Sequence, residues 1–441
     1  DDIANRKIEL AVGASTHYYD SFATAVQDAA SAGAVDARIK FLVDISESPN
    51  VEMSMPGDAS WTVDLDGHKC SFAEGANITA GTTDNASTLT IENGTFTFLE
   101  GANGYGVLVG MKTSLRAEGV QFVQNCTYKR TLAYLLSLQT ITQANIASSF
   151  TNCSFVQNIN NSDTDTGDSL TTALLGCSGA NYSTNLTFSG CTFETRRATT
   201  SKKGNTYALR LPGYAQVTFE GANTINMSVT RDVVTGNTNS GIDWITGTQA
   251  PSSKKPASVS CKGTLDVRFS SGVLAEESFA AFTAPNEYVT YNFNSSFALS
   301  TSGFTQAYAL NLTGSNKNVA VGANFDRLEP TGLDSAFTTQ GCFVVKGVVS
   351  EGDVAATAFD GATITEKQAA LFKANSDDST ISGVLDSENN RIVWKDTAER
   401  VQVDNDKKFP SMQAAFNSID ASDSTAHSLR ILDGNDIQMA S

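Results

Sequence analysis

The sequence is poor in charge, proline and histidine, and each shortage narrows what the chain can be. Charged residues make up 17% of its 441 residues against 40% hydrophobic residues, so the chain is not disordered throughout. The 8 prolines and 34 glycines follow no Gly-X-Y period, which excludes a collagen-like fold. A membrane-spanning helix needs about 18 apolar residues in a row. The best apolar stretch, from Leu132 to Leu138, is far too short for one.

Positive charge is scarce as well. Lys and Arg number 30 against 47 Asp and Glu, which gives a net charge of −17 and a pI near 4.6. Proteins that bind nucleic acid neutralise its phosphates with clustered Lys and Arg. The charge balance therefore disfavours nucleic acid as the main partner.

Pairs of metal-binding cysteine and histidine are also missing. The seven cysteines contain no C-x-x-C pair, and the three histidines are scattered at His17, His68 and His427. His68 lies near Cys70, but no second pair of ligands is close in sequence, so a zinc site is not expected. The first residues are polar and carry no signal peptide, which is compatible with a mature exported chain whose leader has been removed.

Short repeats organise the sequence. The tetrapeptide Glu-Gly-Ala-Asn occurs three times, each time just after a phenylalanine, and a shorter Gly-Ala-Asn occurs twice more. Gly and Asn tolerate a left-handed backbone, so each copy predicts a turn that closes a strand. The copies lie at Glu74–Asn77, Glu100–Asn103 and Glu220–Asn223, and the triplets at Gly179–Asn181 and Gly322–Asn324.

A second motif combines phenylalanine with cysteine and then an aromatic residue. It occurs at Phe150 and Cys153, at Phe188 and Cys191, and with one extra residue at Phe122 and Cys126. Apolar and polar residues alternate within it, which is typical of a strand with one buried face. Short strands with Gly and Asn turns predict a β-solenoid, in which like residues stack from coil to coil.

The motif cysteines are then expected to form a ladder of small buried side chains inside the coils, in a structural rather than a catalytic role. Cys177 and Cys191 can form a disulfide if the compartment is oxidising, and the sequence leaves this open.

The two ends of the chain resemble each other. Residues 21–29 and 411–419 each begin with a serine N-cap and continue with apolar residues at helical spacing, which predicts two amphipathic helices. A strand is expected at the same distance after each helix, and a short alternating strand before it. The predicted strands are Ile39–Val43 and Leu429–Leu432 after the helices, and Ile8–Leu10 and Val401–Val403 before them.

This unit resembles the opening of right-handed parallel β-helix proteins of the pectin-lyase-like superfamily, in which a helix covers the N-terminal end. Residues Trp61–His68 look like the first full coil, with Asp66 and Gly67 as its turn. The resemblance covers about the first 260 residues and concerns the fold alone. It implies an all-β fold, a right-handed parallel β-helix (solenoid) with an N-terminal amphipathic capping helix.

We therefore expect a parallel β-helix with its cap over residues 1–400, with less regular coils from about residue 265, and a second copy of the start unit over 401–441. A small helix is expected at Lys367–Lys373, and a separate β-sandwich is the alternative for 265–400. The second start unit has two interpretations. The natural protein continues into another solenoid, which we favour, or the unit plugs the C-terminal end.

One acidic loop is the candidate metal site. Asp163, Asp165 and Asp168 alternate with other residues around Gly167, which resembles a calcium loop because Ca²⁺ takes several oxygen ligands around a tight turn. No Glu closes the loop at the usual distance, and a solvated acidic loop is the alternative.

Two arginines support an enzymatic hypothesis. If the coils stack, Arg196 and Arg197 lie on the same side as the acidic loop. A bound calcium ion beside a basic group is an arrangement that a β-elimination site for acidic polysaccharides can use, because the metal offsets the substrate charge and the basic group takes the proton. A plain basic loop with Lys202 and Lys203 is the alternative. The paired Asp and Gly-His-Gly pattern of β-helix glycoside hydrolases is absent, as are the residues expected of pectinesterases.

Three tyrosines in turns are the candidate binding residues: Tyr105, Tyr182 and Tyr214. An exposed ring in a turn can stack on a sugar or anchor a protein contact, although each ring can also pack locally. We therefore expect an exported or cell-surface, adhesin-like protein of bacterial type, without enzymatic activity, whose partner is a host or environmental glycan or protein. The alternative function is a polysaccharide lyase or glycoside hydrolase acting on an acidic polysaccharide.

Overall fold

The computed structural model describes most of the chain. The described residues are 6–81, 86–99, 104–110, 112–126, 132–139, 146–161, 170–178, 184–199, 204–231, 238–271, 278–302, 306–312, 318–328, 343–346, 350–374, 380–404 and 407–432.

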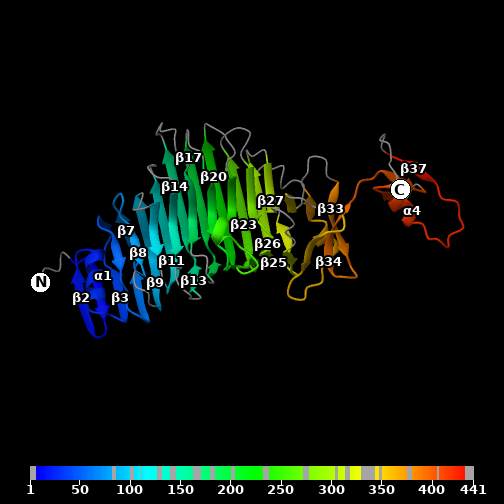
Figure 1. Cartoon of the computed structure of the whole chain (residues 1–441). Coiled ribbons are helices and arrows are strands. Elements are labelled where there is room, and N and C mark those ends of the chain that lie inside the picture. The colour runs from blue at the N-terminus through cyan, green and yellow to red at the C-terminus, as the bar shows by residue number, and fades with distance from the viewer. Residues whose placement is uncertain are drawn as a thin grey trace.

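The described strands stack into an elongated parallel β-solenoid (Figure 1). Parallel pairing runs along three ladders. The first ladder contains β3 (Asp36–Phe41), β6 (Ala59–Asp64), β9 (Ala86–Leu99), β11 (Lys112–Cys126), β13 (Ile146–Thr151), β16 (Thr184–Ser189), β19 (Ala215–Glu220), β22 (Ala257–Cys261), β25 (Val289–Phe293), β28 (Val319–Val321) and β31 (Val354–Ala358).

The other two ladders form in the same way, one strand per coil. The second ladder contains β4 (Ile45–Glu47), β7 (Lys69–Phe72), the C-terminal parts of β9 and β11, then β14 (Ser154–Asn161), β17 (Thr192–Thr199), β20 (Ala222–Arg231), β23 (Thr264–Ser271), β26 (Ser296–Ser302) and β29 (Asp326–Leu328). The third contains β5 (Val51–Met53), β8 (Ile78–Ala80), β10 (Tyr105–Val109), β12 (Leu132–Gln139), β15 (Thr171–Ser178), β18 (Thr206–Leu211), β21 (Thr238–Trp244), β24 (Ser278–Ala284), β27 (Gln306–Leu312), β30 (Phe343–Lys346) and β32 (Phe372–Ala374).

A column of left-handed residues forms one corner of the solenoid, between the first and second ladders. Asn93, Gly119, Asn152, Gly190 and Gly221 have φ values of 59, 61, 50, 66 and 63°. The register places each of them beside the next. Gly and Asn adopt this conformation at the lowest steric cost, so their recurrence explains why these five coils turn at the same place.

Two stacks of phenylalanine fill the coils inside this corner. In one, the Phe122 and Phe155 ring centroids are 5.6 Å apart, and those of Phe155 and Phe193 are 5.0 Å apart. In the other, Phe150 and Phe188 are 5.1 Å apart. Such contacts supply both buried apolar area and favourable ring geometry.

The first copy of the cysteine motif has a different register from the one its sequence predicts. Phe122 stacks with Phe155 rather than with Phe150, and Val120 occupies the place next to Cys153. The predicted ladder therefore contains Cys153 and Cys191, while Cys126 pairs in register with Ile159. The six cysteines in the described part of the chain are buried and free, so the possible bond between Cys177 and Cys191 is not formed.

The Glu-Gly-Ala-Asn repeats make turns where the structure describes them. Asn223 is buried, and its side-chain oxygen accepts a hydrogen bond from the Cys191 amide at 2.9 Å while its nitrogen donates to the Glu220 carbonyl at 2.7 Å. Asn223 thus ties two adjacent coils together at the corner. The copy at Glu100–Asn103 and the triplet at Gly179–Asn181 lie outside the described residues.

The N-terminal unit precedes the first coil. Strand β1 (Ile8–Val12) pairs antiparallel with both β2 (Ser15–Tyr19) and β3. Helix α1 (Phe22–Ser31) begins after Ser21, whose hydroxyl accepts from the Thr24 amide, and lies against β1, β2, β3 and β5. Its buried residues are the four that the sequence predicts: Phe22, Ala25, Val26 and Ala29.

An antiparallel hairpin ends the solenoid. Strand β33 (Ile381–Asp386) pairs with β32, and β34 (Arg391–Asp396) pairs with both β31 and β33. The hairpin therefore covers the last edges of the third and first ladders, which would otherwise expose unpaired backbone groups. Parallel coils continue past residue 265, and the alternative β-sandwich is not what the structure shows in this region.

Two short helical segments interrupt the coils. A 3-10 turn, η3 (Gly247–Gln249), lies after β21. Helix α3 (Glu366–Ala369) is shorter than the predicted Lys367–Lys373, because the chain re-enters a strand at Phe372. It starts with a capping box between Thr365 and Gln368, and the Gln368 amide group also donates to the Gly322 and Phe325 carbonyls, each at 3.1 Å.

The C-terminal unit has its own small sheet and core. Strand β35 (Val401–Val403) pairs antiparallel with β36 (Lys407–Phe409) and with β37 (Leu429–Ile431), and α4 (Met412–Asn417) lies against β35 and β36. In Figure 1 this unit lies beyond the hairpin β33–β34, which covers the last edges of the first and third ladders.

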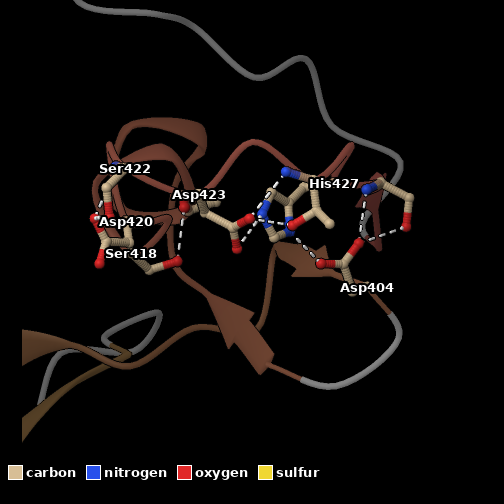
Figure 2. A network of polar contacts seen from close by, with 9 residues as sticks. Asp404, Ser418, Asp420, Ser422, Asp423 and His427 are labelled. Atoms are coloured by element: carbon tan, nitrogen blue, oxygen red, sulfur yellow. Dashed lines mark hydrogen bonds and ion pairs between the residues drawn. The ribbon is translucent and has the colours of Figure 1, made fainter.

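A polar network joins the loops of the C-terminal unit (Figure 2). The His427 Nδ1 lies 2.5 Å from an Asp404 carboxylate oxygen, and its Nε2 lies 3.2 Å from an Asp423 carboxylate oxygen. Asp404 also accepts from the Ser428 amide at 2.7 Å. These contacts connect the end of β35 with the segment that precedes β37.

Candidate binding site

A recurring interruption of the pairing in the third ladder separates an outer tyrosine cluster from the core. Tyr134 and Leu136 pair with β15, while Leu135 between them is skipped. Leu135 and Leu136 both lie in the main core, so two consecutive side chains point inward. Tyr134 and Ser137, on either side of this pair, therefore lie on the opposite, outer face.

Three tyrosines gather on this outer face. Tyr134 and Tyr207 are buried together with Ala173 in a cluster separate from the main core, and Tyr105 packs against them partly buried. The rings of Tyr105 and Tyr134 meet edge to face, with centroids 6.1 Å apart. Gly176 leaves room for the Tyr134 ring, because a Cβ at Gly176 would lie 2.4 Å from a ring carbon.

An arginine on the same strand as Tyr207 and an aspartate one coil further on extend the cluster. The Arg210 guanidinium donates to the Tyr134 hydroxyl at 2.7 Å and lies 5.5 Å from the centre of the Tyr207 ring. Asp243 is the register partner of Arg210 on β21, and it accepts from the Thr283 hydroxyl at 2.9 Å. We call Tyr105, Tyr134, Tyr207, Arg210 and Asp243 the outer cluster.

Burial is the main influence on the ionisation of the outer cluster. Burial raises the pKa of Tyr134 and of Tyr207, so both hydroxyls stay neutral near pH 7. Burial works to lower the pKa of Arg210, but the tyrosine hydroxyls and Asp243 outweigh it and raise that pKa. Burial also raises the pKa of Asp243. The tyrosines and Arg210 therefore provide hydrogen-bond donors and a positive charge.

The tyrosines predicted as binding residues lie in different places. Tyr105 stands at the rim of the outer cluster. Tyr214 lies in the turn between β18 and β19 with a φ of 63°, and its amide donates to the Lys255 carbonyl at 3.4 Å. Tyr182 lies outside the described residues, as do Asp163, Asp165 and Asp168 of the predicted calcium loop.

The two predicted arginines lie on opposite faces of β17. Arg196 is exposed and pairs with Glu194 at 2.6 Å. Arg197 is 1% exposed, and its guanidinium donates to the Gly204 carbonyl at 3.2 Å and to the Thr206 hydroxyl at 2.9 Å. Because side chains alternate along a strand, the two guanidinium groups lie on opposite sides of β17.

The other members of the outer cluster were not predicted from the sequence. A usable signal was the recurrence of Tyr-Ala-Leu at residues 207–209 and 308–310, related to Tyr-Leu-Leu at 134–136. These three tripeptides mark the interrupted pairing in three coils of the third ladder.

The part of the chain that the structure describes lacks a membrane-spanning helix and a metal-ligating cluster. No helix there is both long and apolar enough to span a membrane. No group of three or more His, Cys, Asp or Glu there is arranged to hold a metal ion. In comparisons with known proteins, no family model, curated protein or solved structure matches the chain.

Proposed function

We propose that this chain is an exported or cell-surface, adhesin-like β-solenoid that binds a host or environmental glycan and has no enzymatic activity. The observation that carries the proposal is the outer cluster, in which Tyr105 and Arg210 remain partly exposed above buried Tyr134 and Tyr207. We further propose that the fold is a right-handed parallel β-helix whose N-terminal end is capped by α1.

The outer cluster has the groups that sugar recognition uses. An aromatic ring such as Tyr105 offers an apolar face against which the C–H face of a pyranose stacks. The Arg210 guanidinium presents charge-assisted donors to hydroxyl or carboxylate oxygens, and Asp243 presents an acceptor. The contacts with Tyr134 and Thr283 hold both charged groups in place before a ligand binds.

Binding to a glycan array and to a panel of surface proteins tests this function. We expect glycan binding that weakens at least about tenfold in both Tyr105→Ala and Arg210→Ala, since each removes a direct contact. Tyr214→Ala is the matched control, because Tyr214 lies in a turn away from the outer cluster. Binding only to proteins, or glycan binding that both cluster variants retain, contradicts the proposal.

The enzymatic alternative has a separate readout. The full chain is incubated with acidic polysaccharides, with calcium and with a chelator, and products are followed by absorbance and reducing ends. Unsaturated or hydrolysed product that disappears in Arg196→Ala or Arg210→Ala would replace the binding function by a lyase or hydrolase. We expect no product under either condition.

A further inference from the structure

The N-terminal and C-terminal units have the same topology but differ in what covers them. In each, a central strand pairs with a hairpin partner and with the strand after the helix. The register matches as well: Glu9 pairs with Lys40, and Gln402 pairs with Arg430. Both helices start after a serine whose hydroxyl caps the third amide that follows.

Equivalent side chains differ sharply in exposure between the two units. Phe41 is fully buried, while Ile431 in the same position is 52% exposed. Val26 on α1 is 1% exposed, while Phe416 on α4 is 48% exposed. The C-terminal unit therefore presents an apolar face that its N-terminal counterpart buries.

The first coil of the solenoid is what buries the face of the N-terminal unit. Strand β3 pairs in parallel with β6 from Asp36 to Lys40. The Phe41 ring packs against Phe96 at 6.4 Å. The buried Glu47 on β4 reaches back to α1, where its carboxylate accepts from the Phe22 amide at 2.5 Å.

An ion pair adds to the contact between the N-terminal unit and the first coil. The Lys40 ammonium lies 3.0 Å from the Asp66 carboxylate, in the turn that follows β6. Arg430 occupies the position of Lys40 on β37 and is exposed. In the described residues, β37 pairs with β35 on one edge, and its other edge has no strand beside it. The C-terminal unit thus combines an apolar face, an open strand edge and a cation at the positions where β3 contacts the first coil in the N-terminal unit.

We infer that residues 401–432 form a docking surface for a parallel β-solenoid coil. The occupant is a coil of the same polypeptide with a carboxylate facing Arg430. The occupant corresponds to residues 43–66, which fill the equivalent place on the N-terminal unit. This inference does not depend on the outer cluster or on glycan binding. It assigns the C-terminal unit a role in assembling a further solenoid.

An extension of the chain tests directly whether residues 401–432 form this docking surface. Residues 43–126 are attached after Leu432, as they follow Leu42 in the N-terminal unit, and amide hydrogen exchange is followed at β37. We expect exchange of the β37 amides to slow at least about tenfold relative to the native chain, because a new parallel strand covers the open edge. The same extension on Ile431→Asp is the matched control and should leave exchange fast.

Two outcomes would overturn the inference. Unchanged exchange at β37 in the extended chain would mean that the unit does not accept a coil. A native chain that forms dimers, dissociated by Ile431→Asp, would show that a second copy covers this face instead. Ile431 is an exposed side chain, so the unextended Ile431→Asp chain should fold as the native chain does. We expect native monomers by analytical ultracentrifugation.

Discussion

The units at the two ends of the chain show what local sequence decides and what it leaves to its surroundings. Both form the same three antiparallel strands and the same serine-capped helix. Helix α1 buries four side chains, whereas α4 buries Ala415 alone among its described residues. Topology is thus common to both units, and the neighbouring coil accounts for the difference in burial.

The difference in burial has a thermodynamic consequence. The N-terminal unit shares a continuous core with the solenoid, while the C-terminal unit has a separate small core around Val401, Val403 and Ala415. Because stabilisation by burial scales with the apolar area removed from water, the C-terminal unit is expected to unfold locally first.

The largest difference between the units should come from a pair of alanine substitutions. Phe41→Ala removes a fully buried ring that contacts Phe22 and Phe96, and we expect it to lower the free energy of unfolding by about 3–5 kcal/mol. Ile431→Ala, at the equivalent exposed position, should change it by less than about 0.5 kcal/mol. Denaturant unfolding followed by Trp fluorescence and circular dichroism measures both. Equal costs would show that Ile431 is covered in solution.

The helix caps should behave alike in both units, because a cap is a local interaction. The Ser21 hydroxyl accepts from the Thr24 amide at 3.1 Å, and the Ser411 hydroxyl accepts from the Ala414 amide at 3.1 Å. We expect Ser21→Ala and Ser411→Ala each to cost about 1 kcal/mol in local opening of the helix, measured by hydrogen exchange. Ser→Asp at each site retains an acceptor and is the control. A cost in one unit alone would contradict this symmetry.

Features set by neighbours in the sequence were predictable, and features set by register between coils were not. The helix at Phe22, the turn at Asp66 and Gly67 and the strands at both ends follow from periodicity and from Gly and Asn. The stacking of Phe122 with Phe155 was misassigned, because the extra residue before Cys126 concealed that Val120 takes the cysteine position.

The outer cluster illustrates the same limit for function. Tyr134 and Arg210 are 76 positions apart, yet their side chains form a hydrogen bond because the coils bring them onto one face. The interruption of the pairing at Leu135 decides which side chains point outward, and a period-2 pattern does not reveal it. Of the predicted residues, Tyr105 reached the outer cluster because it lies on the third ladder, whereas Arg196 lies on the second.

The smallest predicted effect is a pH dependence of the C-terminal unit near neutral pH (Figure 2). His427 lies between Asp404 and Asp423, and its hydrogen bond with Asp404 is the main reason why the pKa of His427 is raised above 6.5. The same bond lowers the pKa of Asp404 below 3.8. The charged pair therefore stabilises the unit fully between these ordinary values.

Both ends of the chain lose stability as pH rises, but over different pH ranges. Stabilisation by His427 is lost as pH rises through its folded pKa, because the imidazole then loses its positive charge and with it the ion pair with Asp404. At the N-terminal unit, burial raises the pKa of Glu47 above 4.5, so stability there falls as pH rises from 4.5 through that folded pKa. Near pH 7 and above, we expect the hydrogen exchange rate of the β35 amides to rise with pH more steeply than the intrinsic exchange rate of an unfolded peptide does. The β3 amides should show no such excess. His427→Gln should abolish the excess at β35, and an excess that persists in this variant would assign the dependence to another group.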